Sequence, residues 1–371
     1  IRIGSRKSKL SLWQSNLVAT SLKEIYPEAL IEIVKISTKG DENLKQSLPE
    51  IGGKGVFTEE LERELINKDI DCAVHSLKDL PTENKDNLIL GAVLKRASVE
   101  DVLITRDRCS FSELENNSKI GTSSLRRSSQ MKSLRNDIEV VDIRGNVPTR
   151  IEKVFDNSTK YDAVILAKAG VDRLNLSEYI DEIFTTKQLV PAPGQGAIAV
   201  QCLEESRSIF SKLNDELTSI TTTVERSFLQ YLGGGCSLPV GAYCEIENEH
   251  LTINARVVSL DGKDVVDVSK ISIAIPEKEK SVFAEALGKE LAKDARLSPE
   301  DLQAKLDAKK DKRAQKKEAI KAQKIAELEA KAKEEAEEEA AAEEAPAEEP
   351  VAEEAAPAEE EAPAEEEEKE E

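Results

Sequence analysis

Strand-like and helix-like segments alternate along the first 200 residues, and this alternation constrains the fold more than any other feature of the sequence. The opening stretch "IRIG" predicts a strand, and "SKLSLWQSNLVATSLKEIY" after it has apolar residues at helical spacing. Further strand-like runs include "LIEIVKIST", "DCAVHS", "DVLIT" and "YDAVILAKAGV". Repeated strand–helix–strand units predict an α/β fold whose ligands bind beyond the carboxyl ends of its strands.

The pattern changes at about residue 216. A helix-like stretch, "SITTTVERSFLQYL", is followed by three strand-like runs with a turn at "LDGK" and by a closing helix, "KSVFAEALGKELAKD". We expect this part to form a small α+β domain of its own.

Residues 293–371 differ from the rest in composition. They carry 28 acidic and 14 basic side chains and so account for most of the formal net charge of −21. The tail begins with a helix-prone Ala/Glu/Lys-rich stretch. From Ala345 it repeats proline and blocks of like charge, which cannot build a packed core. We expect a disordered acidic tail; an interaction segment for basic partners is the alternative.

The cysteines and the hydropathy of the sequence indicate in which cellular compartment the protein acts. The five cysteines are scattered and form no CxxC pair, which favours reduced thiols. His75 and His250 are the only histidines, so we expect no zinc or other metal site. No apolar run is long enough to span a membrane, and no basic-then-apolar leader precedes "IRIG". We therefore expect a cytoplasmic protein with no membrane partner.

Four arginines follow two neighbouring predicted strands. In "KIGTSSLRRSSQ" a strand runs into a helix start, where Ser124 offers a hydroxyl and Arg126 and Arg127 offer guanidiniums. The next strand ends in "DIRGNVPTR", which contains Arg144 and Arg150. Such a cluster predicts a polyanionic ligand, and carboxylates suit it as well as phosphates. A Walker loop is absent from the sequence.

Another strand end carries a carboxylate. In "CAVHSLKDLPT" the strand leads into Lys78 and Asp79, and Pro81 restricts the turn. A fixed carboxylate there could stabilise a cation or accept a hydrogen bond. Alone, however, "KDLP" is also a common polar turn, and His75 is more often a structural histidine than a base.

Three loops complete the set of candidate sites. The loop "GSRKSKL" carries Arg6 and Ser8, and "GGKGVFTEE" carries Lys54 in a glycine-rich turn. In "YLGGGCSLPVG", three glycines precede Cys236. One glycine is sufficient to end a helix, so the run favours close approach of a ligand to the backbone.

Together these stretches resemble the porphobilinogen deaminase family, whose members are also called hydroxymethylbilane synthases. The matching stretches, which cover residues 1 to about 292, include "GGKGVFTEELE", "AVHSLKDLPT", "GTSSLRR", "IRGNVPTR", "PAPGQGA" and "ERSFLQYLGGGCSLPVGAY". The resemblance implies two lobes similar to periplasmic binding proteins, with a third, cofactor-bearing domain. The corresponding segments are residues 1–95 with 197–213 for the first lobe, 99–191 for the second and 216–292 for the third domain.

The resemblance also implies the chemistry. Four porphobilinogen molecules are condensed head to tail with loss of ammonia, giving hydroxymethylbilane. The family's loop cysteine falls on Cys236 and carries a covalent dipyrromethane cofactor, and its catalytic aspartate falls on Asp79. The family's groups for binding the cofactor and substrate fall on Lys78, Ser124, Arg126 and Arg127, and on Arg6, Ser8, Lys54, Arg144, Arg150 and Gln195. By analogy, Phe57 stacks over the incoming ring.

Some positions depart from the family pattern, and two other functions stay open. Lys9, Glu50, Pro148 and Lys168 stand where the family commonly has other residues. The first alternative is a non-catalytic protein that closes on a polycarboxylate and leaves Cys236 idle. The second is an RNA-associated protein, which the Lys-rich part of the tail suggests. The mildly acidic body argues against nucleic acid, and nothing in the sequence demands more than a monomer.

Overall fold

The structure is a computed structural model that describes residues 1–38, 40, 57–83, 85, 87–233, 238–247, 250–272 and 280–294. Two of the predicted site residues, Lys54 and Cys236, lie outside the described residues, as does the tail after residue 294. The rest of the predicted site can be placed.

The first lobe is built on a five-stranded sheet with the order β2-β1-β3-β10-β4, in which β10 runs antiparallel to its neighbours. Its strands are β1 (Arg2–Arg6), β2 (Glu32–Ile36), β3 (Cys72–Ser76), β4 (Leu88–Val93) and β10 (Ile198–Leu203). Helix α1 (Lys9–Ile25) packs on the face that carries Cys72 and Val74, and α4 (Glu59–Ile66) packs with Ala73. Successive strand residues point to opposite faces, so the two helices cover opposite sides of the sheet.

The second lobe repeats this topology. Its sheet has the order β7-β6-β8-β5-β9, again with one antiparallel strand, β5, in the fourth position. The strands are β5 (Asp101–Thr105), β6 (Lys119–Gly121), β7 (Glu139–Val141), β8 (Ala163–Ala167) and β9 (Glu182–Ile183). Helix α5 (Leu125–Leu134) and helix α6 (Val147–Phe155) supply Met131 and Val154 to the two separate cores of this sheet. The short helix α7 (Lys168–Asp172) follows β8.

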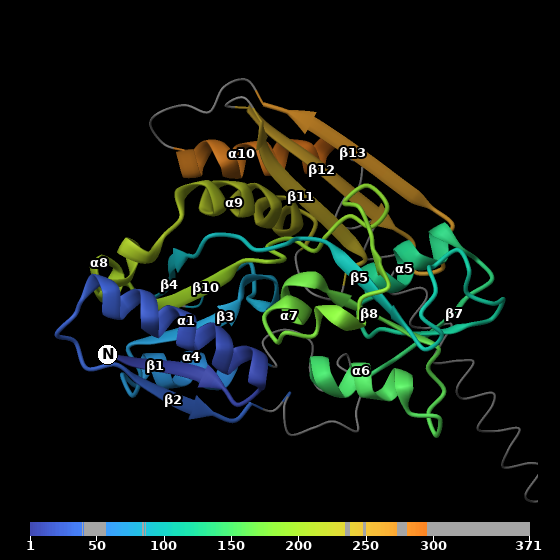
Figure 1. Cartoon of the computed structure of the whole chain (residues 1–371). Helices are drawn as coiled ribbons and strands as arrows, with labels where there is room; N and C mark the ends of the chain where they lie inside the picture. The colour runs from blue at the N-terminus through green and yellow to red at the C-terminus, as the bar shows by residue number, and fades with distance from the viewer. Residues whose placement is uncertain are drawn as a thin grey trace, which may run out of the picture. The chain divides into compact units, whose positions relative to one another are not determined.

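Two chain crossings join the lobes (Figure 1). The chain leaves the first lobe after β4 and returns to it through β10. Between them Ala97 donates its N–H to the carbonyl of Gly196. Gly196 has a φ of +87°, and a Cβ there would lie 2.5 Å from the Ala97 carbonyl oxygen. The stretch "PAPGQG" therefore needs glycine at this position so that the two crossing segments can touch.

A third domain follows β10 after three short helical turns, η3 (Glu204–Ser206), α8 (Arg207–Phe210) and η4 (Ser211–Leu213). It consists of α9 (Glu216–Tyr231), β11 (Val240–Glu247), β12 (His250–Val258), β13 (Val265–Ile271) and α10 (Lys280–Asp294). The three strands form an antiparallel meander, and both helices pack on it around Val224 and Phe228. This arrangement confirms the small α+β domain that the sequence predicted.

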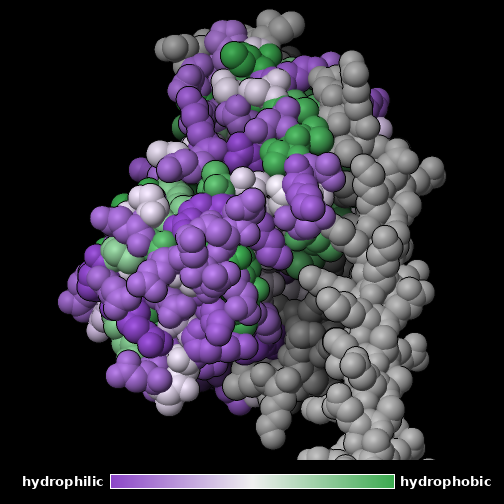
Figure 2. Space-filling view, turned by 90° about the vertical axis from the view of Figure 1, so that its right-hand side faces the viewer, coloured by the Kyte–Doolittle hydropathy of each residue, from purple (hydrophilic) through white to green (hydrophobic). Residues whose placement is uncertain are grey.

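Figure 2 shows one face of the molecule, on which hydrophilic residues predominate and hydrophobic ones occur in small groups. None of the helices in the described residues combines the length and apolar composition that crossing a bilayer requires.

Candidate active site

A short turn at the carboxyl end of β3 carries Asp79. The turn is η1 (Leu77–Asp79), a single 3₁₀ turn closed by a hydrogen bond from the Leu80 N–H to the Leu77 carbonyl at 3.2 Å. Leu77 and Leu80 are buried and anchor the turn in the lobe, whereas Asp79 is exposed. The local sequence thus fixes the backbone while leaving the carboxylate open to a ligand.

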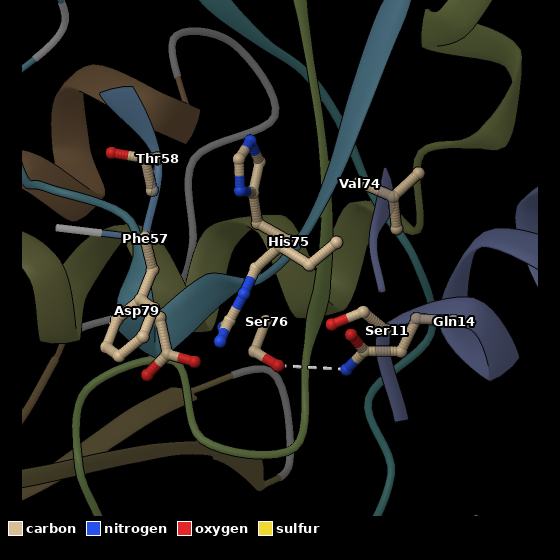
Figure 3. Close-up of a pocket in the computed structure, with 9 residues that line it drawn as sticks. Ser11, Gln14, Phe57, Thr58, Val74, His75, Ser76 and Asp79 are labelled. Atoms are coloured by element: carbon tan, nitrogen blue, oxygen red, sulfur yellow. Dashed lines mark hydrogen bonds between the residues drawn. The ribbon is translucent and has the colours of Figure 1, made fainter. Parts of the chain in front are cut away.

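Asp79 lines a small pocket at the end of the first sheet. Figure 3 shows Asp79 and Phe57 on one side of this pocket and Ser11, Gln14 and Ser76 on the other, where Gln14 donates a hydrogen bond to Ser76. The remaining lining residues are Arg6, Thr58, Val74 and His75. The guanidinium of Arg6 lies 4.1 Å from the centre of the Phe57 ring, a cation–π contact that joins two predicted binding residues.

His75 is a neutral structural group. Its Nε2 atom and the Oε1 atom of Gln201 are 3.0 Å apart, and Gln201 in turn donates to Glu62. Burial lowers the pKa of His75 to about 4, even though the Gln201 bond acts in the other direction. At neutral pH the imidazole is therefore uncharged, and we assign it no proton-transfer role.

Lys78 links the Asp79 turn to the crossing segment. Its Nζ donates to Oε1 of Gln195 at 3.3 Å, and Nε2 of Gln195 donates to Asp101 Oδ1 at 2.9 Å. Burial first, and the charge of Arg127 second, lower the pKa of Lys78 to about 8, while Asp79 opposes them. The ammonium is thus held among cations and loses its proton more readily than an exposed lysine.

One buried carboxylate, Asp101, holds both arginines of the "GTSSLRR" stretch. Arg126 donates to Asp101 Oδ2 at 2.7 Å, and Arg127 donates to Oδ1 through Nε at 3.0 Å and Nη2 at 2.8 Å. The side chains of Arg126 and Arg127 are only 5% and 7% exposed, and that of Asp101 is fully buried. Burial alone would raise the pKa of Asp101, but the two guanidiniums outweigh it and hold this pKa well below its usual range.

The predicted serines act as helix caps. Ser8 is the N-cap of α1 and accepts a hydrogen bond from the Ser11 N–H, and Ser124 is the N-cap of α5 and accepts one from the Arg127 N–H. Ser124 therefore fixes the start of the helix that carries the arginine pair. The Ser8 hydroxyl also donates to Ser11 Oγ at 2.8 Å, whereas that of Ser124 can donate to a ligand.

Arg144 and Arg150 lie at the next strand end. Both are half-buried, and Arg150 donates through Nε to the Gly145 carbonyl at 2.8 Å. Burial, followed by the charges of Arg127 and Arg144, lowers the pKa of Arg150 to about 10, while Asp142 and then Asp79 act against them. The side chain stays cationic at neutral pH.

These mutual electrostatic effects connect the two lobes. Asp79 of the first lobe acts on Arg150 of the second, and Arg127 of the second acts on Lys78 of the first. We call Arg6, Lys78, Asp79, Arg127 and Arg150 the strand-end cluster. Arg6 is the last residue of β1, and Lys78 and Asp79 follow the end of β3. Arg127 and Arg150 lie in the first turns of α5 and α6, the helices that follow β6 and β7.

Sequence reasoning missed three charged residues near the site. Asp101 opens a strand, and the adjacent Glu225 and Arg226 lie within α9. Glu225 is fully buried and binds Arg96 with two bonds at 2.7 and 2.9 Å, while it accepts the Gly194 N–H at 2.7 Å. In the sequence these residues look like ordinary charges of amphipathic elements, so only the partners that the fold brings to them reveal their role.

The donor set at the site fits a ligand with several carboxylates. Guanidiniums and an ammonium lie within electrostatic reach of the exposed Asp79, so acetate and propionate groups find cationic partners while a positive centre finds Asp79. A dipyrromethane with such side groups is compatible with this set. Its predicted anchor, Cys236, lies outside the described residues.

Family comparisons agree with this chemistry. A family profile described as "Porphobilinogen deaminase, dipyromethane cofactor binding domain" matches residues 1–211. A second, "Porphobilinogen deaminase, C-terminal domain", matches residues 219–296.

Two curated relatives are named porphobilinogen deaminase. That of Natranaerobius thermophilus is 42% identical over 297 residues, which cover 79% of this chain and 94% of the relative. That of Desulforamulus reducens is 44% identical over 269 residues, covering 72% and 86%. Among solved structures, the substrate binding domain of a molybdenum ABC transporter from Clostridium difficile aligns at 10% identity with a TM-score of 0.35. It covers 59% of this chain and 93% of that one.

Proposed function

Because the chain belongs to the porphobilinogen deaminase family, we propose that the strand-end cluster is the centre of its reaction. The enzyme is a transferase of tetrapyrrole and haem biosynthesis. It condenses four porphobilinogen molecules head to tail, releases ammonia and forms hydroxymethylbilane on a dipyrromethane primer. The observation that carries the proposal is the exposed carboxylate of Asp79 among cations from both lobes.

Asp79 acts on the positive charge that develops on the substrate. The bond between the methylene carbon and the protonated amino nitrogen breaks, its electron pair leaves with neutral ammonia, and a cation remains delocalised over the pyrrole. A carboxylate fixed nearby stabilises that cation. When the new carbon–carbon bond has formed, the proton on the attacking α-carbon passes to Asp79 and then to solvent.

The cations bind the acid groups of the substrate and of the growing chain. Lys78 lies within the Asp79 turn, Arg127 acts on the pKa of Lys78, Asp79 acts on that of Arg150, and Arg6 stands beside Phe57 in the small pocket. Salt bridges to acetate and propionate would fix each ring with its reactive carbon at Asp79. Residues proposed to share in this binding are Ser8, Lys54, Ser124, Arg126, Arg144 and Gln195.

We place the covalent anchor of the primer at Cys236. The primer supplies the free pyrrole α-carbon to which the first substrate is joined. Gly233 has a φ of +87°, which ends α9 immediately before this segment. A cysteine thiolate is a good nucleophile toward an electrophilic methylene carbon, so this side chain suits a thioether link.

The proposal assigns residues 1–95 with 197–213 to the first lobe and residues 99–191 to the second. Each of these two sets contains all the strands of one sheet. The enzyme acts as a monomer in this proposal, because nothing in the sequence demands a second copy. It acts in the cytoplasm, which suits the free thiols of Cys72, Cys109, Cys202 and Cys244.

Asp79→Asn tests the catalytic assignment. The amide keeps the shape of the side chain but carries no charge, so we expect turnover of porphobilinogen to fall about 10²- to 10⁴-fold with little change in melting temperature. Asp107→Asn, at an exposed turn of the second lobe, is the matched control and should behave as wild type. Normal turnover in Asp79→Asn would remove Asp79 from its role.

A further inference from the structure

Arg226 of α9 reaches across to the turn that carries Asp79. Its Nη2 donates to the Pro81 carbonyl at 2.7 Å, and its Nη1 donates to the carbonyls of Leu80 at 3.0 Å and Leu77 at 3.4 Å. These three residues flank Asp79 on both sides. A side chain of the third domain thus holds the backbone of the catalytic turn in the first lobe.

The Arg226 guanidinium adds much to the order of this turn. The bond that closes η1 measures 3.2 Å, longer than the bonds from Arg226 to Leu80 and Pro81. Pro81 restricts Leu80 but has no N–H to donate. Hydrogen bonds from a guanidinium to carbonyl oxygens are charge-assisted and directional, so they fix both the position and the orientation of the turn's backbone.

The helix that presents Arg226 is itself fixed. The neighbouring Glu225 binds Arg96 through both oxygens, accepts the Gly194 N–H, and accepts the Cys244 N–H at 2.8 Å. These partners lie in the chain crossing and in β11. Consequently α9 cannot slide or rotate by a small amount without breaking a buried ion pair.

Helix α9 also leads directly into the segment on which we placed the primer. It ends at Tyr231, five residues before Cys236. The same helix therefore carries, on one side, the contact to the Asp79 turn and, at its end, the chain that bears the anchor.

We propose that Arg226 is a positioning residue for the reaction: it holds the Asp79 turn in register with helix α9. The proposal rests on the function assigned to Asp79 above. Arg226 contacts neither substrate nor reacting atoms in this role. It acts through the carbonyls of Leu77, Leu80 and Pro81.

The experiment compares Arg226→Gln and Arg226→Lys with wild type, each as the purified, cofactor-loaded enzyme. Arg106→Gln is the matched control, because Arg106 also donates to backbone carbonyls, those of Val154 and Tyr161, but within the second lobe. We would measure kcat, KM and hydrogen exchange of the amides in residues 76–82. Intact mass would confirm equal loading.

We expect Arg226→Gln to lower kcat about tenfold to a hundredfold while KM changes less than about twofold, because the reacting carboxylate is misplaced but the binding cations remain. Amides of the Asp79 turn should exchange faster. Arg226→Lys should recover part of both properties, since an ammonium can still donate to one or two carbonyls. Arg106→Gln should leave kcat and the exchange of this turn unchanged.

Unchanged exchange in Arg226→Gln would overturn the proposal, and so would faster exchange with normal kcat. Asp79→Asn measured in parallel separates the two possible faults. If the Arg226 test fails and Asp79→Asn also retains turnover, the function assigned to Asp79 is wrong. If the Arg226 test fails but Asp79→Asn abolishes turnover, Asp79 keeps its role and only the assignment of Arg226 is wrong.

Discussion

The two sides of the site treat their ionisable groups in opposite ways. On the first lobe Asp79 is exposed, His75 is neutral, and the pKa of Lys78 lies at about 8. On the second lobe Asp101 is fully buried, and two guanidiniums lock its charge. The first lobe therefore holds Lys78, which can change its protonation near pH 8, whereas the second lobe holds a buried ion pair whose charges are fixed.

This difference separates chemistry from architecture. A carboxylate that stabilises a transient cation must be reachable and must not be neutralised beforehand, which suits Asp79. A carboxylate that orients two arginines must be paired and dry, which suits Asp101. Two aspartates at similar places in the two lobes thus serve different purposes because their surroundings differ.

The largest expected change in stability concerns the buried ion pair of the second lobe. Asp101→Asn leaves the buried guanidiniums of Arg126 and Arg127 without their countercharge, so the free energy of unfolding should fall by about 3–5 kcal/mol. Urea unfolding followed by circular dichroism measures this, with Asp107→Asn as the control. A loss below about 1 kcal/mol would show that Asp101 is not the anchor of the pair.

The second prediction concerns the buried imidazole of the first lobe. The pKa of His75 is about 4 in the folded chain and 6.5 for the free group, so between these values the unfolded state binds more protons. Stability is therefore lost as pH falls from 6.5 towards 4. Between pH 6.5 and 5 the wild type should lose about 2 kcal/mol more than His75→Gln, which keeps a donor for Gln201. Identical pH profiles would contradict the neutral assignment.

The third prediction uses Lys78, whose pKa of about 8 places its deprotonation within reach of an assay. Above this pH the site loses a cation, so kcat/KM at pH 9 should be about tenfold below its plateau. In Lys78→Arg the guanidinium keeps its charge, and the profile, normalised to its own plateau, should stay flat to pH 9. Lys187→Arg, on an exposed lysine, is the control. The same decline of kcat/KM in Lys78→Arg would show that a group other than Lys78 causes it.

The smallest effect is expected from removing the tail. A chain ending at Asp294 retains all the described elements of both lobes and of the third domain. Its kcat and melting temperature should match those of the full chain, with kcat within about twofold. A large loss of activity would mean that the tail contributes to the site and that the groups of the two lobes do not account for it alone.

The sequence predicted the α/β fold and the strand ends that carry the proposed site residues. Strand and helix periodicity located β1, β3 and α1, and the strand ends located Asp79 and the four arginines, because these signals are local. The partners of those residues were not predictable. Asp101 and Glu225 are distant in sequence from the arginines they bind, and each looks like an ordinary charge until the fold encloses it.

The most direct test of the account is the intact mass of the purified, denatured protein. The account predicts a covalent addition equal to two linked pyrroles in the wild type and in Cys109→Ser, and its absence in Cys236→Ser. Asp79→Asn should retain most of the addition. An unmodified mass for folded, active wild-type protein, or an addition that persists in Cys236→Ser, would contradict it.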